Sequence, residues 1–91
     1  MSYTVIYNFV AKAGLRDQVI DAFGIVRGAA GLNALELYKD QANVNKLVCV
    51  ENWESQAHHD RFIDAFTPEQ SAEFASMFEE PPVPKVYALA G

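Results

Sequence analysis

The sequence has too few cysteines, basic residues and long apolar runs to fit several classes of protein. Its 91 residues include one cysteine, Cys49, so no disulfide can form within the chain. The 12 acidic side chains outnumber the 7 basic ones, the net charge is −5, and the basic residues form no cluster. Nucleic acid and anionic membrane surfaces are therefore not expected as partners. No stretch approaches the roughly 20 apolar residues that a membrane-spanning helix needs.

Signals for secretion and for cofactors are also missing. The N-terminal stretch MSYTVIYNF has no basic region, no apolar run of signal-peptide length and no small-residue cleavage site, which predicts a cytoplasmic protein. Cys49 lies in the apolar segment LVCVENW and is expected to be a small buried hydrophobic side chain. There is no glycine-rich phosphate loop or nucleotide-binding fingerprint. We predict no metal site, because the adjacent His58 and His59 cannot easily direct both rings at one ion.

Apolar residues are abundant, and their spacing predicts the secondary structure. The chain is 51% hydrophobic, which is enough for the core of one domain over residues 1–91. Strands are predicted where β-branched and aromatic residues gather, and helices where apolar residues recur every three or four positions. The predicted strands are 3–11, 32–39, 46–54 and 85–90; the predicted helices begin at Leu15, Ser55 and Thr67 and end near Gly28, Phe66 and Phe78.

Turn and cap residues support these boundaries. Gly28 suits the left-handed residue that commonly ends a helix. Ser55 is a good N-cap, and the run TPEQ at 67–70 combines an N-cap, a proline at the first helical position and a capping box. Residues 79–85, EEPPVPK, are expected to form a connector, because their prolines exclude helix.

The order of these elements is typical of one fold class. The series β-α-β-β-α(α)-β is that of an α+β, ferredoxin-like fold, with a four-stranded antiparallel sheet and helices on one face. In this topology the strands lie in the spatial order 4-1-3-2. Residues 85–90 are therefore predicted to pair with residues 3–11.

Both faces of the first strand are apolar, which predicts a homodimer. One face carries Tyr3, Val5, Tyr7 and Phe9, and the other carries Ile6 and Val10. The helices can cover only one face, and the other would expose a larger apolar patch than monomers usually tolerate. A second copy packed against the sheet would cover it. We therefore predict a homodimer through the sheet face.

Four segments occur in an order and spacing typical of a known family. They are YNFVAKAG, AAGLNALELYKD, LVCVENWES and a helix that contains HHDRF, and together they span nearly the whole chain. The matching features are Gly14, Gly31 and, above all, the E-x-W-x-S segment of Glu51, Trp53 and Ser55. In these features the chain resembles the antibiotic biosynthesis monooxygenase family. The resemblance implies a dimeric α+β barrel with a pocket between the helices and the sheet of each subunit.

The resemblance also carries expectations about chemistry. Characterised members of the family oxidise polycyclic phenols or quinols with molecular oxygen, without metal or flavin, and some members degrade haem. The haem-degrading members bind the iron through a histidine that would fall about one helical turn after His58 and His59, near Phe62. Because that histidine is missing here, neither haem nor any other cofactor is expected.

Three polar side chains are candidates for catalysis: Asn8, Trp53 and His59. Cofactor-free oxygenation needs a phenolate held by hydrogen-bond donors in a pocket that excludes water. Trp53 can only donate, and active family members use a tryptophan here; a core position is the alternative. Asn8 could bind a ligand, as an asparagine on this strand does in some active members, or make a structural hydrogen bond. His59 lies near the centre of its helix's apolar stripe and is the candidate base, although a hydrogen-bonded structural histidine is also possible.

Four further residues are candidates for substrate binding. Phe23, Phe62 and Phe66 could line an aromatic pocket, or their helical spacing could place them in the core. His58 lies at the edge of the apolar stripe and is expected at the rim of the pocket or in solvent.

These features predict a cofactor-independent monooxygenase that acts on a small aromatic phenol or quinol with O2. The alternative is a non-catalytic dimeric binding module that holds a small apolar ligand in the same pocket. A third interpretation is a structural dimer whose cleft is filled by side chains.

Overall fold

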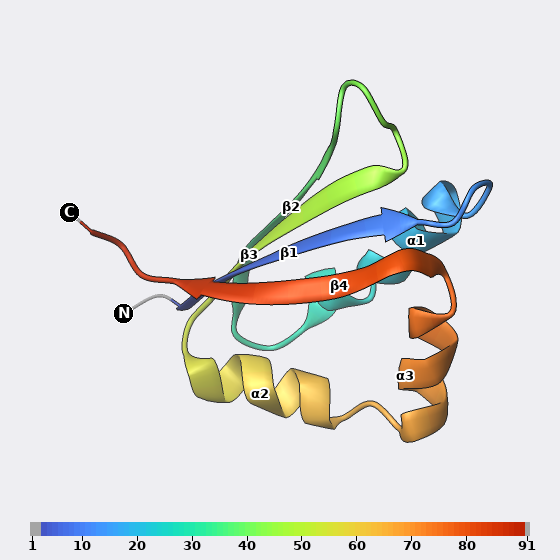
Figure 1. Ribbon diagram of the computed structural model, residues 1–91. Coiled ribbons are helices and arrows are strands. Elements are labelled where there is room, and N and C mark those ends of the chain that lie inside the picture. The colour runs from blue at the N-terminus through green and yellow to red at the C-terminus, as the bar shows by residue number, and fades with distance from the viewer. Residues whose placement is uncertain (1–2, 91) are drawn as a thin grey trace.

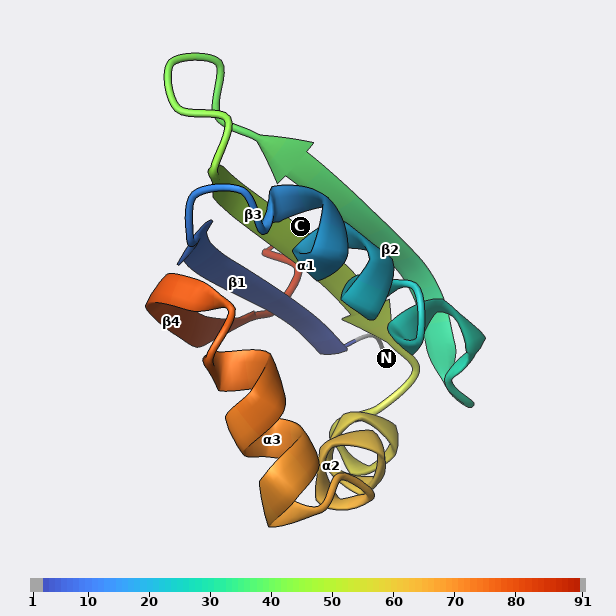
Figure 2. The same cartoon turned by 90° about the vertical axis from the view of Figure 1, so that its right-hand side faces the viewer.

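The computed structural model describes residues 3–90 and has the predicted ferredoxin-like α+β architecture (Figure 1). Four strands form one antiparallel sheet in the order β2-β3-β1-β4, and the three α-helices lie against one of its faces (Figure 2). The elements are β1 (Tyr3–Ala11), α1 (Arg16–Phe23), the 3₁₀ turn η1 (Val26–Gly28), β2 (Leu32–Lys39), β3 (Lys46–Trp53), α2 (Gln56–Asp64), α3 (Pro68–Ala75) and β4 (Phe78–Tyr87).

The last strand confirms the predicted topology but not the predicted boundaries. β4 pairs with β1, with Val86 opposite Val5, as expected for the order 4-1-3-2. However, β4 spans Phe78–Tyr87, so the expected connector over 79–85 belongs to the strand. Three prolines are tolerated because β4 is an edge strand with no neighbour on its outer side, and because its pairing with β1 is irregular between Asn8 and Ala11.

The first helix also ends differently from the prediction. α1 stops at Phe23, and the chain continues through η1, which begins with the buried Val26. Gly28 does not adopt a left-handed conformation; within the described residues only Gly14 and Gly31 have positive φ. A 3₁₀ turn can direct Val26 into the core without extending the α-helix.

Alternation along the strands builds the core. On β1 and β3, every second residue points to the helices. Most of these residues are buried, namely Val5, Phe9, Ala11, Leu47, Cys49, Glu51 and Trp53, whereas Tyr3 and Tyr7 are half-buried. The Phe9 ring stacks on Phe23 at 5.2 Å between centroids and meets the edge of Phe78 at 5.1 Å. Burial and the neighbouring Glu51 raise the pKa of the Cys49 thiol, so Cys49 is the small buried side chain that was predicted.

The second and third helices lie against the sheet less closely than α1. Their starts confirm the predicted caps: the Ser55 hydroxyl accepts from the His58 backbone N–H, and Thr67 and Gln70 form a capping box. Yet neither α2 nor α3 contains a buried residue, whereas α1 buries Val19 and Phe23. The side chains of α2 and α3 are therefore less covered than those of α1.

Candidate functional site

A cavity of about 680 Å³ lies between the three helices and the inner face of the sheet. Aromatic and aliphatic side chains make most of its wall: Phe23, Val26, Phe62, Ile63, Phe66, Phe74, Met77 and Pro82. Exposed polar residues, including Gln18 and Glu73, also line it. The sheet contributes Tyr7 from β1 and Glu51 from β3. The third interpretation from the sequence, a cleft filled by side chains, is therefore wrong for this chain.

Glu51 is the most unusual residue of this wall. Only 3% of it is exposed, and it is the one buried polar or charged residue within residues 3–90. Its Oε1 accepts a hydrogen bond from Trp53 Nε1 at 2.9 Å, and its Oε2 accepts from Cys49 Sγ at 3.5 Å. These contacts follow from strand geometry, because residues two apart on β3 lie on the same face.

Tyr7 is linked to His59 on α2. The Tyr7 hydroxyl and His59 Nε2 are 2.8 Å apart, and His59 Nδ1 is 3.3 Å from Asp60 Oδ1. Because the Asp60 carboxylate can only accept, Nδ1 carries the proton in this arrangement and Nε2 accepts from the tyrosine. The imidazole also meets Trp53 edge-on at 5.5 Å and lies 5.6 Å from Tyr3.

Burial makes Tyr7 and Glu51 hold protons more firmly than they would in water. The pKa of the Glu51 carboxyl is raised by its removal from solvent, and the bonds from Trp53 and Cys49 and the proximity of His59 offset part of this rise. The pKa of Tyr7 is raised by burial and then by the charge of Glu51. Tyr7 therefore keeps its hydroxyl proton at neutral pH, and the Glu51 carboxyl keeps its proton to a higher pH than a carboxyl in water does.

Comparison of the sequence with protein-family models identifies the family of this chain. The family model described as antibiotic biosynthesis monooxygenase matches residues 2–80. The chain belongs to the antibiotic biosynthesis monooxygenase family. No functionally curated protein matches it in sequence.

Solved structures of low sequence identity share the fold of this family member. Rv0793 from Mycobacterium tuberculosis is 20% identical with a TM-score of 0.79, and the match covers 100% of this chain and 97% of that one. A conserved protein from Methanosarcina mazei is 13% identical with a TM-score of 0.79, covering 96% and 91%. A variant of SnoaB, a cofactor-independent oxygenase from Streptomyces nogalater, is 10% identical with a TM-score of 0.80, covering 99% and 94%.

The structure brings together two of the three predicted catalytic residues. Trp53 and His59 are in contact, but neither is among the residues that line the cavity. Trp53 is fully buried, and its indole N–H, expected to face a ligand, is bonded to Glu51. His59 reaches the cavity through the Tyr7 hydroxyl.

Asn8 lies on the opposite face of the sheet, where it is exposed. The expected convergence of Asn8 with Trp53 and His59 in one cleft is therefore not found within this chain. The reason is the alternation of β1: Tyr7 points to the helices, so its neighbour must point away. The same alternation pairs Asn8 with Val48 on β3 and Val83 on β4.

The predicted substrate-binding residues divide into two groups. Phe23, Phe62 and Phe66 line the cavity. His58 does not: its Nδ1 is 2.7 Å from Ser55 Oγ, and its ring packs on Gly31 so closely that a Cβ there would collide with it. With φ +86°, Gly31 also needs a residue without a side chain. His58 is thus part of the joint between α2 and the start of β2.

Sequence reasoning gave Glu51 no chemical role, and it considered Tyr7 for positioning a substrate or for packing without connecting it to His59. A signal was present in the E-x-W spacing, because a glutamate on the apolar face of a strand needs a buried donor and Trp53 stands two residues away. The Tyr7–His59 contact carried no local signal, since 52 residues separate the pair.

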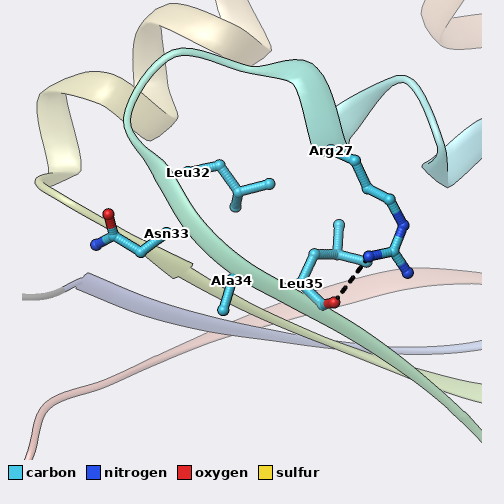
Figure 3. Close-up of a pocket in the computed structure, with 5 residues that line it drawn as sticks. All are labelled: Arg27, Leu32, Asn33, Ala34 and Leu35. Atoms are coloured by element: carbon cyan, nitrogen blue, oxygen red, sulfur yellow. Dashed lines mark hydrogen bonds between the residues drawn. The ribbon is translucent and has the colours of Figure 1, made fainter.

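A second, smaller hollow of about 170 Å³ lies beside β2 (Figure 3). It is lined by Arg27 of η1 and by residues 32–35. Arg27 Nη1 donates to the Leu35 carbonyl at 3.1 Å, so the guanidinium already occupies a free backbone acceptor of this edge strand. Because Arg27 is its only charged lining residue, this hollow offers no acid–base pair, and the large cavity is the candidate active site.

Residues 3–90 contain neither a cluster of metal ligands nor a helix that could span a membrane. No group of three or more His, Cys, Asp or Glu side chains there could hold a metal ion. None of the helices in that range is long and apolar enough to cross a membrane.

Proposed function

We propose that this chain is a cofactor-independent monooxygenase that oxidises a small aromatic phenol or quinol in the large cavity. The observation that carries this proposal is a cavity with aromatic walls and a polar floor, formed by Tyr7 and Glu51 of the sheet. Its volume of about 680 Å³ falls in the range of roughly 300–1,000 Å³ typical of small-molecule sites. The family match and the fold shared with SnoaB support it by analogy.

The wall suits a flat, apolar ring. Phe62 and Phe66 meet edge to face at 5.1 Å, as do Phe23 and Phe74 at 5.5 Å. Rings in such arrangements present both faces and edges to a bound aromatic molecule. A bound ring that displaces water from this wall would also strengthen the hydrogen bonds to a developing phenolate.

Each polar residue of the floor is hydrogen-bonded to a second side chain, so the floor contains two pairs. In the first, His59 orients the Tyr7 hydroxyl, which we propose contacts the substrate oxygen. In the second, Trp53 holds the Glu51 carboxylate at the cavity wall. His59 and Trp53, predicted to be catalytic, would then act through Tyr7 and Glu51 as positioning residues.

We also propose that the open face of the sheet forms a homodimer. Its centre carries apolar side chains that no part of residues 3–90 covers: Ile6, Val10, Val48, Val50 and Val83. Asn8 lies among them and would hydrogen-bond across the interface rather than bind substrate. This arrangement is supported by the size of an apolar surface that monomers seldom expose.

Oxygen consumption tests the enzymatic proposal. Metal-free wild-type protein is supplied with a panel of hydroquinones and polycyclic phenols, and O2 uptake and products are followed together. Tyr7→Phe is expected to lower kcat by 10-fold or more, whereas Tyr38→Phe, which removes an exposed hydroxyl on β2, should leave it unchanged. Absence of uptake with every member of the panel would count against an oxygenase.

One observation favours the alternative of a non-catalytic binding module. Within residues 3–90 every buried side-chain N or O atom already has a hydrogen-bond partner, as a passive pocket would require. Native mass spectrometry of the purified protein, followed by aerobic incubation with the bound compound, separates the two functions. A retained aromatic ligand that is recovered unchanged would support the binding module.

A further inference from the structure

The Glu51 carboxyl is buried and takes part in no ion pair within residues 3–90. The ion pairs found within residues 3–90 are Arg16–Asp17 and His59–Asp60, and neither includes Glu51. Its strand neighbours on the inner face are the uncharged Leu47, Cys49 and Trp53. Burying a carboxyl group in this way costs stability. A residue with only a structural task at this position could be apolar.

The hydrogen bonds of Glu51 leave part of the carboxylate free. An ionised carboxylate has about four acceptor positions, and Trp53 and Cys49 occupy one on each oxygen. The residue also lines the cavity. The bond from Trp53 fixes the orientation of the group, and at least one remaining lone pair is available to a bound molecule.

Resting on the proposed oxygenase function, we infer that Glu51 is the catalytic base, which removes the proton from the phenolic hydroxyl of the substrate. Trp53 is its positioning residue. The other candidates are less suited: Nε2 of His59 already accepts from the Tyr7 hydroxyl, and Tyr7 keeps its own proton because burial raises its pKa. Because the pKa of Glu51 is raised, it differs less from the pKa of a phenol. A smaller difference in pKa makes proton transfer from the phenol to Glu51 easier.

The proposed reaction balances with O2 as the only co-reactant. Glu51 takes the hydroxyl proton, and the electron pair stays on the phenolate. The phenolate transfers two electrons to O2, and a bond forms between a ring carbon and oxygen. The resulting peroxide takes the proton back from Glu51. Glu51 then removes the proton of that ring carbon, a carbonyl forms as the O–O bond breaks, and the departing hydroxide takes this proton to give water and a quinone.

A kinetic comparison tests the role of Glu51. Glu51→Gln keeps the shape and can still accept from Trp53, and it is expected to lower kcat by about 10²–10⁴-fold. The loss should shrink for more acidic phenols, which ionise without help. Glu69→Gln, at an exposed position of α3 that does not line the cavity, should keep wild-type rates for all of them. A Glu51→Gln variant with wild-type kcat on the least acidic phenol overturns the inference.

A binding measurement separates this inference from the proposed function. Para-nitrophenol is bound under nitrogen at a pH below the pKa that this phenol has in water. With the wild type it should show the absorption band of the phenolate. With Glu51→Gln it should show only the band of the neutral phenol. Phenolate formation without oxygen uptake in air would support Glu51 as a base and contradict the oxygenase. Oxygen uptake by a wild type that binds only neutral nitrophenol would contradict Glu51 instead.

A second variant covers the case in which Glu51→Gln does not fold. Trp53→Phe removes a donor that lowers the pKa of Glu51, so the acid limb of kcat should move to higher pH. The other titratable groups facing Glu51 are Tyr7, Cys49 and His59, and all are retained in this variant. An unmoved acid limb would contradict the assignment.

Discussion

The two faces of this sheet are built from the same strands but differ in their polar residues. The inner face carries two hydrogen-bonded pairs, the half-buried Tyr7–His59 and the buried Trp53–Glu51, beside the cavity. On the open face the polar contacts are exposed or half-buried, such as those of Asn52 with Thr4 and Asn33. The difference shows that position within the strand period, rather than residue type, decides which polar side chain can take part in chemistry.

The largest loss of stability is expected when Trp53 on the inner face is replaced. Trp53→Ala removes a fully buried ring that contacts His59 and Phe62, and it leaves Glu51 with only the Cys49 thiol as a donor. We expect the free energy of unfolding to fall by about 3–5 kcal/mol, measured by urea denaturation. Leu89→Ala, at a side chain that is 84% exposed, is the control and should change it by less than about 0.5 kcal/mol.

A charged residue introduced at the centre of the open face tests the proposed dimer interface. Val50 lies opposite Ile6 on β1 and Glu36 on β2, in the middle of the proposed interface. Val50→Lys should weaken dimerisation on the order of 100-fold, or about 2.7 kcal/mol. Light scattering and the dependence of the melting temperature on protein concentration measure the change.

The control for this experiment is Glu79→Lys at an exposed position of β4. It adds a positive charge away from the apolar centre and should leave the dimer intact. A wild-type protein that is monomeric at micromolar concentration, with a melting temperature independent of concentration, would refute the interface.

A smaller effect is expected at the joint between α2 and β2. Gly31→Ala introduces a Cβ into the ring of His58 at a residue with φ +86° and should cost about 1–3 kcal/mol. Adding His58→Ala removes the collision but not the backbone strain, so the double variant should recover part of the loss. If His58→Ala alone abolished activity in a folded protein, the structural role assigned to His58 would be wrong.

The smallest effect concerns the pH dependence of stability. The pKa of Glu51 is raised above its ordinary value of 4.5 in the folded protein, so the folded state binds more protons than the unfolded state between these two values. Stability from this group is present below pH 4.5 and is lost as pH rises through the folded pKa.

Glu51→Gln should abolish this component, which amounts to at most about 1.4 kcal/mol per pH unit. The difference in unfolding free energy between the wild type and this variant is measured at a series of pH values. A difference that stays constant with pH would show that the carboxyl has its ordinary pKa.

Much of this protein could be predicted from its sequence because the signals are local. Alternation in β1 and β3, helical spacing in α1 and the caps at Ser55 and Thr67 depend on neighbouring residues, and they led to the correct topology. The start of β4 was misjudged for the same reason. Prolines disfavour a strand locally, and only the position of β4 at the sheet edge makes them acceptable.

The site required the tertiary structure. The spacing of Phe62 and Phe66 placed them on one helix face, but it did not distinguish a filled core from a cavity, which depends on how far α2 and α3 stand from the sheet. Nor could it show that the donor of Trp53 is taken by Glu51 or that Tyr7 meets His59. Local periodicity thus determined which face each residue occupies. The contacts between distant segments decided which polar groups satisfy one another and which face the cavity, because hydrogen bonds between them form only after the chain has folded.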